Sequence, residues 1–155
     1  MKLLDDYTRK LHELQATDLR EYVANYFIHK TTERLFETAI QACLDIGRHL
    51  IADRGFRLPE DNKEVFRVLA EEEVIPTRLL SRLEAMAGFR NILVHEYANL
   101  DNRKVYRNLQ ENLNDFDEFA RAIVEYLERT SSASKAARER RARYTTSRTR
   151  KSKRT

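Results

Sequence analysis

The sequence contains little of the material from which tight turns and cross-links are built. Its 155 residues include three glycines, two prolines, one cysteine and no tryptophan. So few turn-forming residues leave little scope for β-hairpins, and this composition favours a helical protein. The single cysteine, Cys43, excludes an internal disulfide and a zinc site built from cysteines. Its apolar neighbours predict a small buried residue.

Long apolar runs are also missing. No run approaches the roughly 18 residues that a membrane-spanning helix needs, and the N-terminus lacks the layout of a signal peptide. We therefore expect a cytoplasmic protein that does not engage a membrane. A length of 155 residues, of which 41% are hydrophobic, fits one domain with a single core.

The formal charge of +4 conceals an uneven distribution. Residues 131–155 hold ten of the 29 basic residues and one of the 25 acidic ones, so they carry +9 and residues 1–130 carry −5. Apolar periodicity also stops at Ser131. We therefore predict a folded domain over residues 1–130 and a disordered basic tail over residues 131–155. The tail either holds RNA phosphates through counterion release or is a solubilising terminus without a partner, and both interpretations stay open.

Apolar residues recur at helical spacing along residues 1–130, and no segment shows the alternation of a strand. Asp18 with Glu21 has the spacing of a capping box at a helix start, and Pro76 suits the first position of a helix. We therefore predict an all-α fold, an antiparallel bundle of four or five helices, with the long second helix at its centre. The expected helices cover about residues 2–15, 19–53, 60–72 and 76–96, and a last helix, whose start is marked by Asn99 and Asp101, runs to about residue 130.

The segment from Gly88 to Tyr97 places an arginine, a histidine and a tyrosine among apolar residues. Cleaving RNA without a metal needs a proton carrier, a cation for the phosphorane oxygens and a grip that holds the phosphate in line. His95 suits proton transfer, and Arg90 offers a fixed charge with fork geometry. Tyr97 could bond a phosphate or stack on a base, and Asn91 could position the phosphate or the His95 ring. We expect neither a metal nor a cofactor, because no Asp, Glu and His set has convincing ligand spacing.

The helical repeat raises a difficulty for this segment. At about 100° per residue, Arg90 and Tyr97 share one face, whereas His95 lies about 140° from Arg90. One continuous helix cannot aim all three side chains at one atom. Either the helix unwinds near His95, or a second subunit completes the site.

The spacing of arginine, four residues, histidine, one residue and tyrosine closely resembles the signature of HEPN-domain ribonuclease toxins of the HepT type. Those toxins are paired with a minimal nucleotidyltransferase antitoxin. The resemblance covers about residues 1–130 in order. Besides Phe89–Tyr97, the segments that carry it are Thr31–Arg34, Ala39–Ile46, Glu64–Phe66, Leu69–Ala70, Val74–Pro76, Met86–Gly88 and Asn114–Phe119.

The resemblance implies a function, a site and a mode of regulation. It implies a homodimer with its site in a cleft at the dimer interface, and metal-independent cleavage of tRNA or mRNA that leaves a 2′,3′-cyclic phosphate. Arg90 and His95 would be the catalytic pair, supported by Asn91. Tyr97 would accept AMP from ATP, transferred by the antitoxin, which adds bulk and negative charge beside Arg90.

Other side chains are weaker candidates. Asp45 lies on the long second helix and either orients Arg90 or His95 from a second layer of the site or faces the surface. The remaining histidines have no partner at ligand spacing and are interpreted as surface or core residues. Four aromatic residues are interpreted as packing residues rather than a base-stacking platform. The histidines are His12, His29 and His49, and the aromatic residues are Tyr7, Tyr22, Tyr26 and Phe27.

Two other functions remain open at this point. The bundle could be a non-catalytic subunit that holds nucleic acid or a nucleotide for a nucleotidyltransferase, with Arg90 and His95 binding phosphate only. It could also be a helical scaffold in which residues 88–97 mediate dimerisation alone.

Overall fold

The computed structural model describes residues 1–95 and 100–152, with side chains described up to residue 136. Within these ranges every regular element is an α-helix, which confirms the predicted all-α class. The chain divides into two compact units, residues 1–122 and residues 123–155. The helices in chain order are α1 (Lys2–Leu14), α2 (Leu19–Ala24), α3 (Tyr26–Arg54), α4 (Asn62–Glu71), α5 (Thr77–His95), α6 (Asn102–Glu111) and α7 (Asn114–Ser152).

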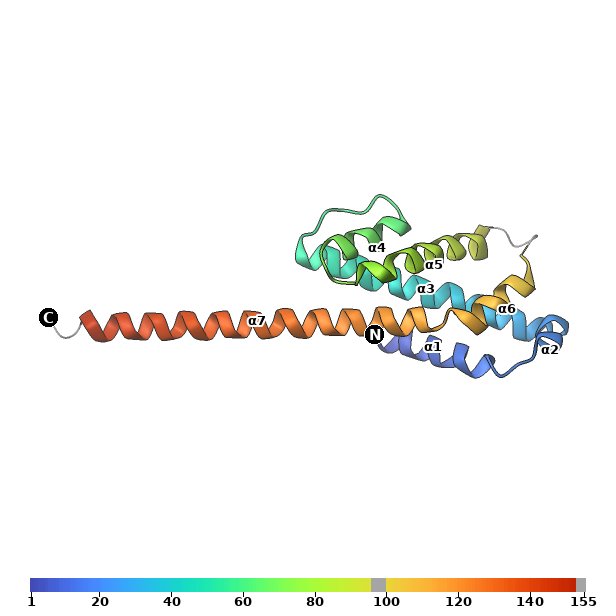
Figure 1. The fold of residues 1–155 in the computed structure, drawn as a ribbon, viewed down its shortest axis with the longest axis horizontal. Helices are drawn as coiled ribbons and strands as arrows, with labels where there is room; N and C mark the ends of the chain where they lie inside the picture. Colours follow the sequence, from blue (N-terminus) through green and yellow to red (C-terminus); the bar gives the residue numbers. More distant parts are fainter. Residues whose placement is uncertain (96–99, 153–155) are drawn as a thin grey trace. The chain divides into compact units, whose positions relative to one another are not determined.

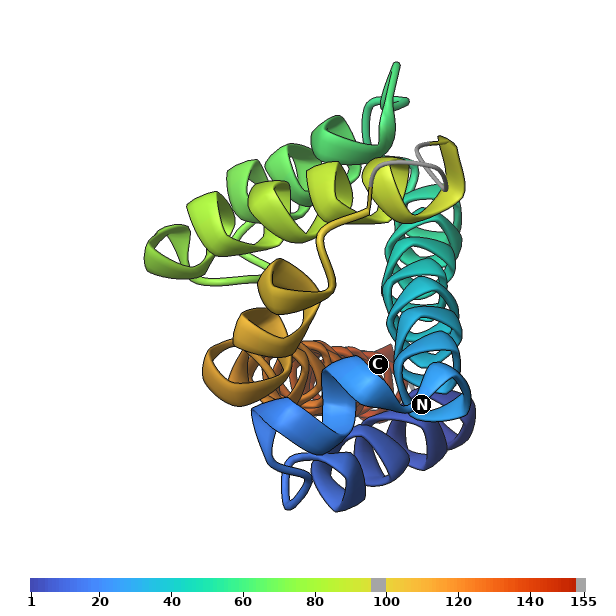
Figure 2. The same cartoon turned by 90° about the vertical axis from the view of Figure 1, so that its right-hand side faces the viewer.

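Helix α3 is the central helix of the first unit (Figure 1, Figure 2). It contacts α1, α2, α4, α5 and α6, as the width of its apolar face predicts. α4 and α5 pack together on one side of α3, and α1 lies on the opposite side. Gly47 allows the close approach of α4, since a Cβ there would lie 2.7 Å from Cγ1 of Val65.

The start of α7 closes the first unit. Phe116 lies against Phe36 of α3 with ring centroids 6.3 Å apart, and Phe119 meets Phe66 of α4 edge-on at 5.9 Å. All four rings are buried, so these contacts tie the first turns of α7 to the core. Other fully buried core residues of this unit are Leu4, Leu11, Tyr22, Ile40, Leu44, Ile51, Leu69, Ile75 and Leu79.

Most helix boundaries follow the predicted ones, and two expected helices are divided. Asp18 caps α2 by accepting a hydrogen bond from the amide of Glu21 at 2.9 Å, as its spacing predicts. The expected helix over residues 19–53 breaks at Asn25, whose side chain caps α3 and whose backbone is extended. The expected last helix, which runs to about residue 130, is divided into α6 and α7 in a segment rich in asparagine. Asparagine favours helix ends because its side chain competes for backbone groups.

The structure differs from the sequence-based expectation in where the last helix ends. The loss of apolar periodicity at Ser131 predicts an end near residue 130, whereas α7 continues to Ser152. This part of α7 contains alanines and arginines, which have high helix propensity, alongside serines and threonines. Within the described residues, no helix is long and apolar enough to span a membrane.

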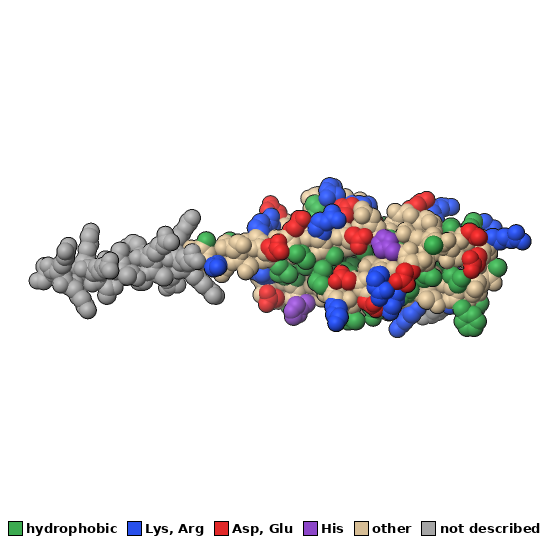
Figure 3. All heavy atoms as spheres, turned by 90° about the horizontal axis from the view of Figure 1, so that it is seen from below, with side chains coloured by type: hydrophobic (Ala, Val, Ile, Leu, Met, Phe, Trp, Pro, Cys, Tyr) green, Lys and Arg blue, Asp and Glu red, His purple; other side chains and the backbone are tan. Residues whose placement is uncertain are grey.

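The surface of the first unit mixes charges of both signs. Figure 3 shows acidic and basic side chains interspersed on one face, with hydrophobic side chains exposed between them. Many of these charges are paired, for example Arg57 with Glu64 and Glu71, and Arg67 with Glu84.

Candidate functional site

The predicted catalytic residues lie at the C-terminal end of α5. This helix starts after Pro76, and its buried face is formed by Leu79, Leu83, Met86 and Leu93 at spacings of three, four and seven residues. The spacing directs this face toward α3 and α4, with which α5 is in contact. Arg90, Asn91 and His95 are not part of this buried face.

Phe89 fixes the rotation of α5 beside the candidate site. Its ring meets Phe36 of α3 edge-on, with centroids 5.4 Å apart and an interplanar angle of 81°. Phe36 is buried, so this contact anchors the residue immediately before Arg90. The backbone that carries Arg90 is therefore held by core packing rather than by the site itself.

Arg90 is half-buried, and its Nε atom is buried without a hydrogen-bond partner. Leaving a buried donor unsatisfied costs about 1–3 kcal/mol, so such atoms are rare and call for an explanation. Among the described residues, Arg90 forms no ion pair with a carboxylate, although α5 carries other arginines that do. The described part of the chain therefore offers no acceptor to this donor.

His95 is the last residue of α5 and is exposed. α5 is continuous from Arg90 to His95, so the helix does not unwind between them. The two side chains therefore leave the helix about 140° apart, by the ideal helical repeat. The residues that follow His95 lie outside the described part of the chain, so unwinding near His95 and completion of the site by a second subunit both stay predictions.

The other predicted site residues contribute less. Asn91 is exposed on α5 and has no hydrogen bond within the described part of the chain. Asp45 is exposed on α3, and its Oδ1 accepts a hydrogen bond from Nε2 of Gln41 at 2.8 Å. It makes no bond to Arg90 or His95, so it has the surface position that the sequence leaves as an alternative. Tyr97 lies outside the described residues.

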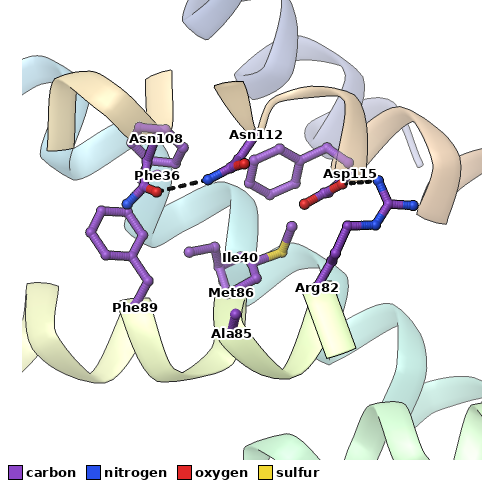
Figure 4. Close-up of a pocket in the computed structure, with 10 residues that line it drawn as sticks. Phe36, Ile40, Arg82, Ala85, Met86, Phe89, Asn108, Asn112 and Asp115 are labelled. Carbon is purple, nitrogen blue, oxygen red and sulfur yellow. Dashed lines mark hydrogen bonds and ion pairs between the residues drawn. The ribbon is translucent and has the colours of Figure 1, made fainter. Parts of the chain in front are cut away.

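A pocket of about 130 Å³ lies beside the anchored part of α5 (Figure 4). Its apolar wall includes Phe36 and Phe89, and two asparagines face it, with Nδ2 of Asn112 donating to Oδ1 of Asn108 at 2.8 Å. Neither Arg90 nor His95 lines it, so it is not the predicted site. The other lining residues are Ile40, Arg82, Ala85, Met86, Asp115 and Phe116.

One edge of this pocket carries an ion-pair network that the sequence analysis missed. Nη1 of Arg82 donates to Oδ1 of Asp115 at 2.6 Å, and Nη2 donates to Oε1 of Glu118 at 3.0 Å. Glu118 also accepts from Arg78 at 2.5 Å. Burial raises the pKa of the Asp115 carboxyl, and the Arg82 charge opposes that shift. These partners are more than thirty residues apart in the chain, so no local pattern predicts them.

A second missed group lies at the start of α3. His29 and Glu33 are both buried, with Nδ1 and Oε1 3.5 Å apart, and Lys30 pairs with the other Glu33 oxygen at 2.8 Å. The hydroxyl of Tyr22 is buried nearby without a hydrogen-bond partner, and burial raises its pKa. The spacing of four residues between His29 and Glu33 is a signal that could have revealed this pair.

Within the described residues, no group of three or more His, Cys, Asp or Glu side chains is arranged to hold a metal ion. The single cysteine does not add to such chemistry, because Cys43 is fully buried and burial raises the pKa of its thiol. Of the predicted catalytic pair, the side chain with the greater solvent access is thus the imidazole of His95, at the C-terminal end of α5.

Comparison with known proteins identifies the fold. Residues 4–123 match the profile of the ribonuclease HepT-like family. The chain belongs to this family. The matched region corresponds closely to the first unit, residues 1–122, so most of the basic C-terminal segment lies beyond it.

Curated relatives of the HepT-like family include two nucleases. The chain is 27% identical over 127 residues to the tRNA nuclease HepT of Aphanizomenon flos-aquae, a match that covers 82% of this chain and 86% of that protein. It is 34% identical over 83 residues to the mRNA nuclease HepT of Shewanella oneidensis. That second match spans 54% of this chain and 62% of the relative.

Solved structures share the HepT-like fold over most of the chain. The tri-AMPylated HEPN toxin of Shewanella oneidensis, in complex with its MNT antitoxin, superposes with a TM-score of 0.74 at 23% identity, over 80% of this chain and 92% of that one. The cytosolic protein YutE of Bacillus subtilis, of unknown function, gives a TM-score of 0.73 at 21% identity, over 83% and 88%. At these identities the likeness establishes the fold alone.

Proposed function

We propose that the protein is the toxin of a toxin–antitoxin pair and acts as a metal-independent endoribonuclease on tRNA or mRNA. The observation that carries this proposal is the buried, unpartnered Nε of Arg90 on the same helix end as exposed His95. An unsatisfied guanidinium donor calls for an external acceptor, and a phosphate oxygen matches its geometry. Membership of a family that includes a tRNA nuclease and an mRNA nuclease supports RNA as the source of that phosphate.

In the proposed reaction, a His95 imidazole removes the proton of a ribose 2′-hydroxyl, and the oxygen attacks the adjacent phosphorus. Arg90 stabilises the added negative charge on the phosphorane oxygens. The bond from phosphorus to the 5′-oxygen then breaks, and this oxygen takes a proton from an imidazolium. The products are a 2′,3′-cyclic phosphate and a 5′-hydroxyl, and no electrons are exchanged with a metal or cofactor. Asn91 and Tyr97 would hold the phosphate.

The proposed site requires two copies of the chain. Because α5 is continuous, Arg90 and His95 of one copy diverge by about 140°. A homodimer in which two α5 ends face each other would bring an arginine of one copy toward a histidine of the other. It would also bring acceptors of the second copy near the guanidinium of Arg90, whose Nε lacks a partner within one chain.

The test of this function is RNA cleavage in excess EDTA. We expect the purified protein to cleave bulk tRNA or an mRNA transcript, and His95→Ala to lower the rate by about 10²–10⁴-fold, the usual contribution of general acid–base catalysis. His49→Ala is the matched control, because His49 is also an exposed histidine but lies on α3 and not on α5. Mass spectrometry of the fragments should find 2′,3′-cyclic phosphate ends. A strict need for a divalent metal, or equal rates for His95→Ala and the parent, would contradict the proposal.

The proposed partner is a minimal nucleotidyltransferase that transfers AMP from ATP to the Tyr97 hydroxyl and releases pyrophosphate. The AMPylated state of the structurally similar Shewanella toxin supports this regulation. The added nucleotide would place bulk and negative charge where the substrate phosphate binds. With the nucleotidyltransferase and ATP, we expect the protein to gain one or more AMP masses on Tyr97 and to stop cleaving RNA. Modification that persists in Tyr97→Phe would place the acceptor elsewhere.

A further inference from the structure

The corner where α2 meets α3 exposes aromatic rings that the sequence predicts to be packed. Tyr26 is 62% exposed and Phe27 is 80% exposed, and Val23 beside them is partly exposed. Of the four aromatic residues interpreted as packing residues, Tyr22 is buried. For Tyr26 and Phe27 the prediction is wrong. Two neighbouring exposed rings on a surface that is otherwise largely polar point to an interaction site.

The exposed rings are held in place. The Asn25 side chain accepts hydrogen bonds from the amides of Phe27 at 3.1 Å and Ile28 at 3.2 Å, which fixes the first turn of α3. The Tyr26 ring meets the His29 ring edge-on at 5.4 Å, and it meets Phe27 at 5.9 Å with an angle of 83°. Rings fixed in this way lose little conformational freedom when a ligand stacks on them.

Two arginines line a hollow beside Val23, on the helix that precedes the exposed rings and on α6. Arg20 of α2 and Arg103 of α6 line a hollow of about 380 Å³, and its other lining residues are Leu19, Val23 and Ala24. Neither guanidinium forms an ion pair with any described residue, whereas arginines such as Arg57 and Arg67 are paired. Both charges are therefore available to an anion at the edge of an apolar surface.

We infer that Arg20, Val23, Tyr26, Phe27 and Arg103, here called the corner patch, bind unpaired nucleotides of the RNA substrate. Bases of single-stranded RNA stack on exposed aromatic rings, while guanidinium groups contact the phosphates between them. Two guanidinium groups that pair with no described carboxylate favour an anionic partner over a purely apolar one. This inference rests on the proposed ribonuclease function and adds a binding site outside the reacting centre.

The position of the corner patch suits this role. Figure 1 shows that α3 and α5 run in opposite directions, so the start of α3 and the end of α5 lie at the same end of the first unit. An RNA strand held at the corner patch can therefore extend toward His95. The corner patch then raises affinity without taking part in the chemistry.

Binding is tested on the full-length His95→Ala protein, which keeps the RNA intact. Fluorescence anisotropy measures the Kd for a labelled single-stranded RNA of twelve nucleotides and for the same RNA as a duplex. Replacing both rings, Tyr26→Ala with Phe27→Ala, should raise the single-strand Kd by about 10–100-fold. Phe27→Trp keeps a stacking surface and should bind as tightly as the parent. Leu58→Ala is the matched control, because Leu58 is also 80% exposed, in the loop between α3 and α4.

The arginines are tested through salt dependence. Arg20→Ala with Arg103→Ala removes two phosphate contacts, so the slope of log Kd against log salt concentration should fall by about 1.4. Arg121→Ala, an exposed arginine of α7 in the first unit, should leave the slope unchanged. Equal affinity for single strand and duplex, or unchanged Kd values for both double variants, would overturn the inference. Loss of nucleotidyltransferase binding or of dimers, with RNA affinity intact, would also overturn it and assign the corner patch to a protein.

Cleavage assays separate this inference from the proposed function. In the protein that keeps His95, Tyr26→Ala with Phe27→Ala should raise KM for RNA cleavage by the same factor as Kd and leave kcat unchanged. If the parent binds single-stranded RNA through the corner patch but cleaves none, the ribonuclease proposal fails and the binding site stands. If the parent cleaves RNA and the double variant matches it in both KM and Kd, the binding site fails and the ribonuclease proposal stands.

Discussion

Two arginines of α5 have opposite surroundings. Arg82 donates to Asp115 and Glu118, so its charge is matched by carboxylates of α7. Arg90 lies eight residues later, carries a buried Nε without a partner, and pairs with no carboxylate among the described residues. The two side chains lie about 80° apart around the helix axis. On one helix, the donors of the Arg82 guanidinium are therefore bonded to carboxylates, whereas a donor of Arg90 has no partner.

This difference separates a structural charge from an available one. A guanidinium whose carboxylates are within the fold has little to offer a phosphate, because binding would first break charge-assisted hydrogen bonds. A guanidinium with an unpaired donor gains a bond when an anion arrives, and the folded chain already bears the cost of leaving that donor unpaired. We therefore expect Arg90 to act in function and Arg82 to act in stability.

The largest expected effect is a difference in kcat for RNA cleavage between the variants Arg90→Met and Arg82→Met. Methionine keeps much of the apolar stem and removes the charge, so the two variants differ chiefly in which guanidinium is lost. Arg90→Met should lower kcat by about 10²–10³-fold, as expected when one group that stabilises transition-state charge is removed. Arg82→Met should stay within a few-fold of the parent in kcat, measured on the same RNA in EDTA.

Stability gives the control for that comparison. Replacing Arg90 removes an unsatisfied buried donor, so the free energy of unfolding in urea should stay unchanged or rise, by up to about 1–3 kcal/mol, and should not fall. If Arg90→Met were much less stable than the parent, unfolding would explain its lost activity. Equal kcat values for the two variants would break the distinction between the two arginines.

Much of the fold is predictable because local rules govern it. Helical spacing, the Asp18 cap and Pro76 each predict a helix or a helix start from a few neighbouring residues. The division at Asn25 follows from a local rule as well, since asparagine is a good N-cap, but the apolar stripes on either side of it masked that signal. The extension of α7 follows from helix propensity, which apolar periodicity does not measure.

The candidate site is predictable in composition and less so in geometry. Arg90 and His95 stand out in sequence because their spacing matches a family signature. Arg82 is paired because the tertiary fold brings Asp115 and Glu118 of α7 next to it. The local sequence around Arg82 and Arg90 does not contain this information. The exposure of Tyr26 and Phe27 depends in the same way on which surface the rest of the bundle leaves uncovered.

The second expected effect is a loss of stability in Arg82→Met. Asp115 is buried, and Arg82 provides its ion pair at 2.6 Å. Removing that partner leaves a buried carboxylate with an unmatched charge, which should lower the free energy of unfolding at pH 7 by about 1–2 kcal/mol, since Arg82 itself is partly exposed. Arg78→Met is the matched control. Arg78 is more exposed and pairs with Glu118 alone, so its loss should be smaller.

The pH dependence of this loss identifies its cause. Burial already raises the pKa of Asp115 above its ordinary value, and loss of the Arg82 charge should raise it further. An acid whose pKa is higher in the folded state destabilises the fold when ionised, so the penalty is absent below the unfolded pKa of about 3.9 and grows as pH rises through the folded pKa. Hydrogen bonds from Arg78 and Arg82 lower the pKa of Glu118, so ionised Glu118 stabilises the folded state of the parent. This stabilisation is lost as pH falls, which also reduces the difference between the parent and Arg82→Met at low pH. Arg82→Met should therefore approach the parent in urea unfolding near pH 3.5 and fall below it at pH 7. A difference that is the same at both pH values would mean that Arg82 stabilises the bundle through the packing of its stem, and that its pairing with Asp115 and Glu118 contributes little.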